Sequence, residues 1–175
     1  MSRGTLMART AVFPMLLLAA CSDRSAVQSR PQSRSASPDD SAFALVQTRG
    51  HLAMGVDQYT SAHRFESLAD GGRITLVRER DDPAGVTQIR AHMAEIAAAF
   101  RRGDFTVPGF VHDRAVPGTA TMAARRSRIS YSADTLPHGG SLRIHSNDSI
   151  AISAIHQFLA FQRQDHRSPH ADTTH

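Results

Sequence analysis

Two glycine-containing segments, each followed by a helical pattern, constrain the fold of this 175-residue chain most. The segment GGRITL at 71–76 matches GGSLRI at 139–144, and apolar residues alternate with polar ones around both. Such alternation beside a glycine-containing turn signal predicts a β-hairpin. The repetition predicts an α+β, two-layer fold in which repeated ββα units form an antiparallel sheet of about four strands, with two main helices on one face. The alternative is that two unrelated hairpins each precede a helix by chance.

The spacing of apolar residues sets the expected elements along the chain. Apolar residues recur at helical spacing after each hairpin, and Gly103 follows the first helical pattern as a C-terminal cap. A loop is expected after Gly103. The expected elements are a hairpin at about 65–79, a helix at 83–102, a short helix at 119–126, strands at 129–133 and 141–144, and a last helix at 148–164. His92 and His156 fall within about one helical turn of the same place in the two repeats, so we expect them to be structural counterparts.

The N-terminus has the pattern of a bacterial lipoprotein signal. Two arginines precede an apolar run, which ends in LAAC at 18–21. We therefore expect a signal peptide at 1–20 and acylation of Cys21, by palmitate or a similar chain, which would anchor the protein in the lipid bilayer. This predicts a cell-envelope lipoprotein whose domain lies in the periplasm. Ser22 stands where an aspartate would favour retention at the inner membrane, so the outer membrane is the expected location.

The amino-acid composition of the rest of the chain predicts a tether, a single domain and a tail. The range 21–44 is expected to be a disordered tether from Cys21, 45–167 a single α+β domain, and 168–175 a flexible tail, since both ends are polar and poor in large apolar residues. Cys21 is the sole cysteine, which leaves no thiol in the domain for a disulfide or a zinc–thiolate site. All 20 basic residues are arginine and are mixed with 16 acids, without the basic stripe of a nucleic-acid-binding protein.

Histidine and methionine supply the candidate metal ligands. Imidazole and thioether groups together suit copper, because polarizable sulfur favours Cu(I) and imidazole accepts either oxidation state. The candidates are His63, His92, His112, Met54 and Met122, with Asp57 and Gln58 as candidate outer partners that orient an imidazole. These residues are far apart in the sequence, so they form a site only if the fold brings them together. The leading hypothesis is a transition-metal site, with copper favoured, for storage, delivery or tolerance.

Several alternative interpretations of these residues compete with a copper site. His92 also fits the edge of a hydrophobic core, Met122 fits core packing, and Asp57 fits a cap or turn. A non-catalytic interaction domain with an envelope protein partner would expose a broad apolar patch instead of convergent imidazoles. A less favoured alternative is a metal-dependent hydrolase with three histidine ligands and Asp57 as base. No serine-nucleophile, P-loop or dinucleotide motif is present in the sequence.

Five stretches together resemble a family of small exported bacterial proteins. They are MGVDQYTSAHRF at 54–65, DGGRI at 70–74, IRAHMAEIAAAFRRGDF at 89–105, VHDRAVPG at 111–118 and AIHQFLAFQRQDH at 154–166. The resemblance spans about 50–166 and implies an exported single domain without a particular activity. The family pattern maps onto Met54, Asp57, Gln58 and His63, and Ala62 stands where many members have a second histidine. Relatives sometimes carry the label aspartate carbamoyltransferase, but the Ser-Thr-Arg-Thr phosphate loop of that enzyme is absent here.

The lipoprotein interpretation makes a direct prediction for a Cys21→Ser variant expressed in a Gram-negative host. Because the acyl chains supply the membrane affinity, the variant should move from the membrane fraction to the soluble fraction and lose its acyl mass. Fractionation and mass spectrometry of the mature N-terminus measure both. A matched Ser22→Asp variant should remain acylated but shift toward the inner membrane. Membrane association of Cys21→Ser equal to that of the wild type would contradict the interpretation.

Overall fold

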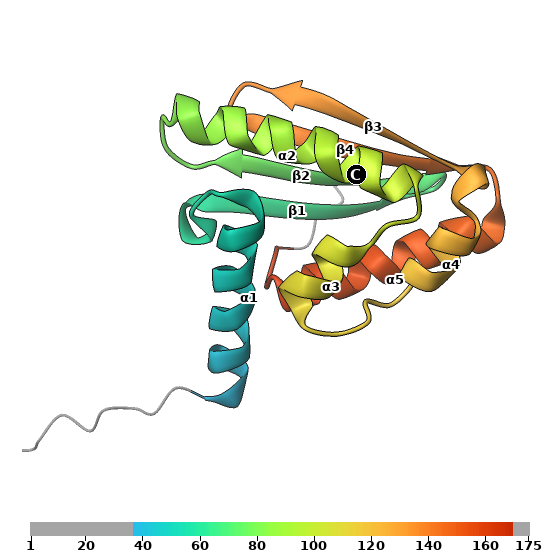
Figure 1. Cartoon of the computed structure of the whole chain (residues 1–175), viewed down its shortest axis with the longest axis horizontal. Helices are drawn as coiled ribbons and strands as arrows, with labels where there is room; N and C mark the ends of the chain where they lie inside the picture. The colour runs from blue at the N-terminus through green and yellow to red at the C-terminus, as the bar shows by residue number, and fades with distance from the viewer. Residues whose placement is uncertain (1–36, 170–175) are drawn as a thin grey trace, which may run out of the picture. The chain divides into compact units, whose positions relative to one another are not determined.

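The computed structural model describes residues 37–169, which form an α+β domain (Figure 1). The expected signal peptide, the acylation site Cys21 and most of the expected tether lie outside the described residues. In chain order the elements are α1 Pro38–Met54, η1 Gln58–Thr60, β1 Ser61–Leu68, β2 Gly71–Arg78, α2 Pro83–Arg101, α3 Thr106–His112, α4 Thr119–Ala124, η2 Arg126–Arg128, β3 Ile129–Leu136, β4 Gly139–Ser146 and α5 Ser149–Asp165.

The sheet joins the two hairpins through their second strands. β1 pairs with β2 and β3 with β4, while β2 and β4 pair antiparallel, which gives the order β1-β2-β4-β3. Ile74 lies opposite Leu142 near the middle of the β2–β4 ladder. The antiparallel four-stranded sheet with helices in a second layer confirms the predicted fold class.

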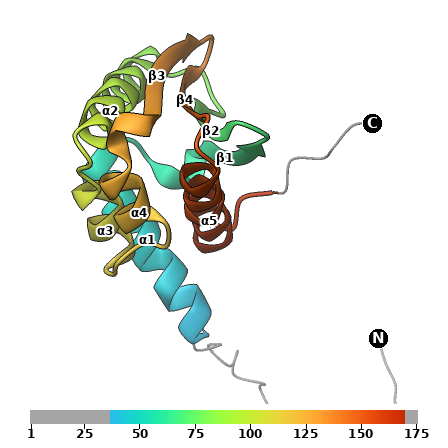
Figure 2. The ribbon, with the colours of Figure 1, turned by 90° about the vertical axis from the view of Figure 1, so that its right-hand side faces the viewer.

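The helices α2 and α5 each pack mainly on the hairpin of the other repeat. Figure 2 shows α2 and α5 on the same side of the sheet, where α2 contacts β3 and β4 and α5 contacts β1 and β2. The glycine pairs provide the room for these crossings. A Cβ added at Gly72 would meet Leu159 Cδ1 of α5 at 2.1 Å, and one added at Gly140 would meet Met93 Cγ of α2 at 3.3 Å. Leu159 and Met93 are therefore counterparts in the two repeats.

This correspondence corrects the expected pairing of His156 with His92. Counted from Leu159 and Met93, the counterpart of His156 is Arg90. Both side chains donate to the carbonyl at the end of the first strand of the other repeat's hairpin. His156 Nε2 lies 2.9 Å from Leu68 O, and Arg90 Nη2 lies 2.5 Å from Leu136 O. His156 thus has a structural role, in which it ties α5 to the end of β1.

Two helices lie where the sequence analysis predicted no helix. The tether was predicted to extend to residue 44, but α1 begins at Pro38. Ser37 caps this helix by accepting from Asp40 N–H, and Gly55 ends it in the left-handed conformation. α3 lies in the predicted loop after Gly103, and its length of 7 residues is too short for a clear helical periodicity.

Among residues 37–169, no helix combines the length and the apolar character needed to cross a membrane.

The crossing of α5 over Gly72 predicts a strong effect of Gly72→Ala. The new methyl group would overlap Leu159 and approach Glu66 O at 2.7 Å, so we expect a loss of about 2 kcal/mol in the free energy of unfolding. Urea denaturation measures it. Gly109→Ala in α3 is the matched control, because its nearest neighbour is Arg114 O at 3.8 Å and helix propensity favours alanine. Equal stability of the two variants would contradict the packing described.

Candidate functional site

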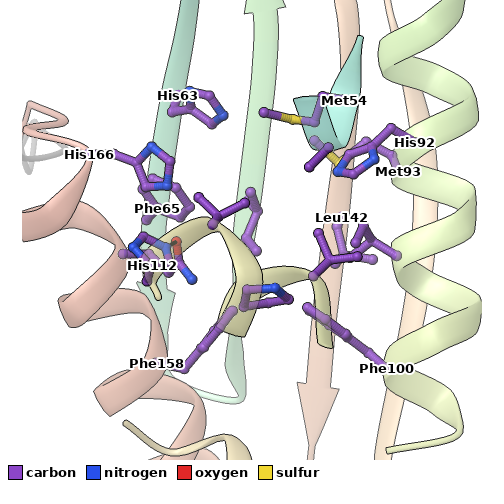
Figure 3. A pocket seen from close by; sticks show the side chains of 17 residues that line it. Met54, His63, Phe65, His92, Met93, Phe100, His112, Leu142, Phe158 and His166 are labelled. Carbon is purple, nitrogen blue, oxygen red and sulfur yellow. Dashed lines mark hydrogen bonds between the residues drawn. The ribbon is translucent and has the colours of Figure 1, made fainter. Parts of the chain in front are cut away.

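A pocket of about 80 Å³ lies between α2 and α5, over the middle of the sheet (Figure 3). Ile74 and Leu142, the pair at the centre of the β2–β4 ladder, form part of its floor. α3 contributes Val107, Pro108 and Val111 to the opposite wall. The pocket therefore occupies the gap between the two crossing helices, and α3 covers part of it.

Four histidines from four elements line this pocket. They are His63 from β1, His92 from α2, His112 from α3, and His166, which follows the last turn of α5. The three imidazoles that the sequence singled out thus share one pocket, although they are far apart in the chain. Met54, at the end of α1, and Met93 of α2 also line it. In Figure 3 the Met54 side chain extends toward His63, while Met93 lies beside His92.

His63 and His166 form the closest imidazole pair of the pocket. Their ring centroids are 4.8 Å apart and their planes differ by 31°. Phe65 lies against both rings, 5.8 Å from His63 and 5.4 Å from His166. His166 Nδ1 is buried without a hydrogen-bond partner. Buried polar atoms are normally paired, so this nitrogen requires an explanation.

Burial keeps three of the imidazoles neutral. Desolvation, followed by the nearby His92, lowers the pKa of His63 to about 4. Desolvation, followed by His63 and His112, lowers the pKa of His166 well below its usual value. The pKa of His92 is also lowered by desolvation, although the Glu95 carboxylate opposes the shift. At neutral pH each of these rings has an unprotonated nitrogen, which is the form that binds metal ions.

His112 differs because both of its ring nitrogens are engaged within the protein. Nδ1 is hydrogen-bonded to the Asp165 carboxylate, and Nε2 lies 2.9 Å from Gln162 Oε1. Asp165 also accepts from Arg114 Nη2 at 2.7 Å. The His112 side chain is only 1% exposed, and its ring meets that of His166 edge-on at 5.1 Å. His112 therefore ties α3 to the end of α5 and borders the pocket without offering a lone pair to it.

Comparison of the two repeats shows that the imidazole pair is not a requirement of the fold. Counted from the hairpin turns, the counterpart of His63 is Tyr131, and counted from the helix crossings, that of His166 is Phe100. Phe100 and Tyr131 are both buried and pack edge to face at 5.7 Å. One repeat thus has an aromatic pair at this position, with the Tyr131 hydroxyl buried without a partner, whereas the other has two imidazoles.

Three residues singled out in the sequence lie elsewhere. Met122, expected as a ligand, is fully buried in the hydrophobic core and does not line the pocket. Asp57 and Gln58, expected to orient an imidazole, are not in the pocket lining either. Asp57 instead caps η1 by accepting from Tyr59 N–H at 2.8 Å, and the Gln58 amide donates to Val56 O. Local backbone geometry therefore accounts for Asp57 and for the Gln58 amide nitrogen, whereas Gln58 Oε1 is buried without a partner.

The sequence analysis did not single out His166. A usable signal was present, because Ile155, Leu159, Gln162 and His166 continue one helical face beyond the end of the α5 pattern. The structure buries the first three of these on the side of α5 that faces the sheet. A histidine that continues a buried stripe can be expected to point in the same direction.

Within residues 37–169, no three His, Cys, Asp or Glu side chains are arranged to hold a metal ion. An ion in the pocket would therefore need a methionine sulfur or an added small ligand beside the imidazoles. Comparison of the chain with protein-family profiles, with curated proteins and with solved structures found no match. The resemblance to an exported family thus stays a prediction, and the site itself must carry the functional argument.

The lowered pKa values predict that acid destabilises the metal-free protein. The pKa of His63 is about 4 in the folded state against 6.5 for a free imidazole, so the unfolded chain binds the proton first as the pH falls. Above pH 6.5 His63 is neutral in both states and does not make the free energy of unfolding depend on pH. Below pH 6.5 that free energy should fall, by about 3 kcal/mol as the pH approaches 4. Urea denaturation in a chelator at several pH values measures this change. A His63→Tyr/His166→Phe variant should show a shallower pH dependence, and an unchanged slope would contradict the assignment.

Proposed function

We propose that the pocket binds a transition-metal ion, with copper as the metal, through His63 and His166. The Met54 sulfur is the third ligand, and His92 and Met93 lie at the neighbouring wall. The protein would serve copper storage, delivery or tolerance in the cell envelope, where acylated Cys21 would anchor it to the membrane. This role requires binding and release of the ion, and no chemical turnover.

The unpartnered Nδ1 of His166 carries the proposal, because among the six buried polar atoms without a partner in residues 37–169 it is the one whose residue lines the pocket. A buried nitrogen without a partner destabilises the folded state by about 1–3 kcal/mol. His166 lies beside a second imidazole, His63, whose nitrogens also form no hydrogen bond to a described residue. A bound ion would satisfy both rings. Two imidazoles that share an ion through N–metal bonds of about 2.0 Å have centroids roughly 5 Å apart, close to the observed 4.8 Å.

The donor set favours copper over harder metals. Magnesium and calcium prefer oxygen ligands, and no carboxylate lines the pocket. Zinc sites usually have four ligands from His, Cys and carboxylates, and no such group of three or more is present in the described part of the chain. Neutral imidazoles with a thioether suit Cu(I), which soft sulfur ligands select. The argument therefore depends on Met54 as well as on the histidines.

His112 has a positioning role in this proposal. Its link to Asp165 and Gln162 fixes α3 against α5, and its ring supports the edge of His166. Outer partners of this kind orient the ligands of metal sites. His112 is therefore not included among the proposed ligands, and neither is Met122.

The two competing functions have less support. The exposed large apolar side chains are Leu45, Leu52, Tyr59, Phe110 and Ile150, which are spread over α1, η1, α3 and α5. Exposed apolar residues of this kind are common on monomeric proteins and do not by themselves indicate a docking surface. A hydrolase with Asp57 as base would need that carboxylate at the pocket, whereas Asp57 caps η1.

The test is an anaerobic titration of the full-length protein in detergent with Cu(I), against a competing chelator. The wild type should bind one equivalent, and His63→Tyr/His166→Phe should lose at least about 100-fold in affinity. These substitutions copy the Tyr131 and Phe100 of the other repeat, so the fold should persist, as circular dichroism would show. His138→Tyr, in an exposed turn, is the matched control. Equal affinity in all three proteins would contradict the proposal.

A second arm of the titration tests the choice of metal. Met54→Leu preserves volume and should lower the affinity for Cu(I) by about 10-fold while leaving any binding of Zn²⁺ unchanged. Met122→Leu is the control, because that side chain lies in the core and should not alter Cu(I) affinity. Tight Zn²⁺ binding with no effect of Met54→Leu on Cu(I) would keep a metal site but exclude copper as its selected ion.

A further inference from the structure

The pocket is larger than the ion that we propose for it. A site of about 80 Å³ is roughly half the size of an apolar cavity of 150 Å³ that stays dry and binds benzene or xenon. Pockets for drug-sized ligands are about 300 Å³ or more, so a large organic molecule does not fit. The volume suits an ion together with a molecule of two or three heavy atoms.

The lining excludes a charged ligand. The walls beside the imidazoles are apolar, and the side chains that form them include Phe65, Ile74, Ile96, Phe100, Leu142 and Phe158. No Asp, Glu, Lys or Arg lines the pocket. A second ion would lose its hydration there without a compensating partner, which is strongly unfavourable. An uncharged molecule meets no such penalty.

The donor set leaves the ion accessible. His63, His166 and Met54 are the three proposed ligands, and His112 is prevented from supplying a fourth because both of its nitrogens are hydrogen-bonded. His92 and Met93 lie at the neighbouring wall and are not among the proposed ligands. Three protein ligands leave the fourth position of a tetrahedral ion for an exogenous ligand, as in catalytic zinc sites. The apolar part of the pocket adjoins that position.

We propose that this pocket binds a small uncharged molecule of diatomic size as an additional ligand of the copper ion. The inference rests on the proposed copper site and adds the chemical class of the small molecule that would bind there beside the protein ligands. Carbon monoxide is the probe, because it is uncharged, of the right size and a ligand for Cu(I). Its carbon donates to the ion in a new bond, no bond breaks, and the oxidation state of copper does not change.

The experiment combines two probes on the full-length protein. Xenon, followed by ¹²⁹Xe NMR, reports the apolar space without copper, and the infrared stretch of bound carbon monoxide reports the open position of the Cu(I)-loaded protein. Ile74→Phe should fill the floor of the pocket, abolish xenon binding and weaken carbon monoxide binding by about 10-fold, with Cu(I) affinity changed by less than about 3-fold. Ile152→Phe is the matched control, since Ile152 is a partly buried α5 residue outside the pocket.

The outcomes separate this inference from the copper site itself. If Ile74→Phe unfolds the protein, Val107→Phe fills the pocket from α3 instead, with the same expected losses. A wild-type protein that binds Cu(I) but shows no carbon monoxide band would overturn the inference and leave the copper site intact. Xenon and carbon monoxide binding that neither filling variant changes would overturn it as well. Failure to bind Cu(I), with xenon still bound, would instead contradict the proposed function.

Discussion

The antiparallel pairing of β2 with β4 determines where every other element of the domain lies. It joins two ββα repeats through their second strands, so that each helix crosses to the hairpin of the other repeat. Gly72 and Gly140 permit these crossings, because their missing side chains let Leu159 and Met93 approach the sheet. The helices diverge over the centre of the sheet, and the pocket lies in that gap. The site is therefore a product of how the repeats combine, and neither repeat alone could form it.

The two repeats use equivalent positions differently, and this difference carries the functional argument. Phe100 and Tyr131 fill one position with buried aromatic rings, although the Tyr131 hydroxyl there is buried without a hydrogen-bond partner. His63 and His166 occupy the other position, where burial lowers the pKa of both rings and leaves a buried nitrogen unpartnered. The proposed metal site rests on this difference, together with the pocket that both imidazoles line.

Periodicity predicted the hairpins and the two long helices, because these elements have one buried and one exposed face. It could not predict α1 or α3, since α1 has few buried side chains and α3 is short. The candidate ligands were chosen by residue type alone, and the sequence could not predict that His63 and His92 line one pocket, because this depends on how the helices cross the sheet. The hydrogen bond of His112 to Asp165 was not predicted, because the two residues are distant in sequence. Such long-range pairing is decided by the tertiary fold.

X-ray absorption at the copper edge of the Cu(I)-loaded, full-length protein tests the central claim most directly, because it identifies the atoms bound to the ion. We expect the copper ion to be bound by two imidazole nitrogens and one sulfur, from His63, His166 and Met54. The imidazole scattering should disappear in the His63→Tyr/His166→Phe protein. A wild-type spectrum without imidazole scattering, or one unchanged in that variant, would contradict the account.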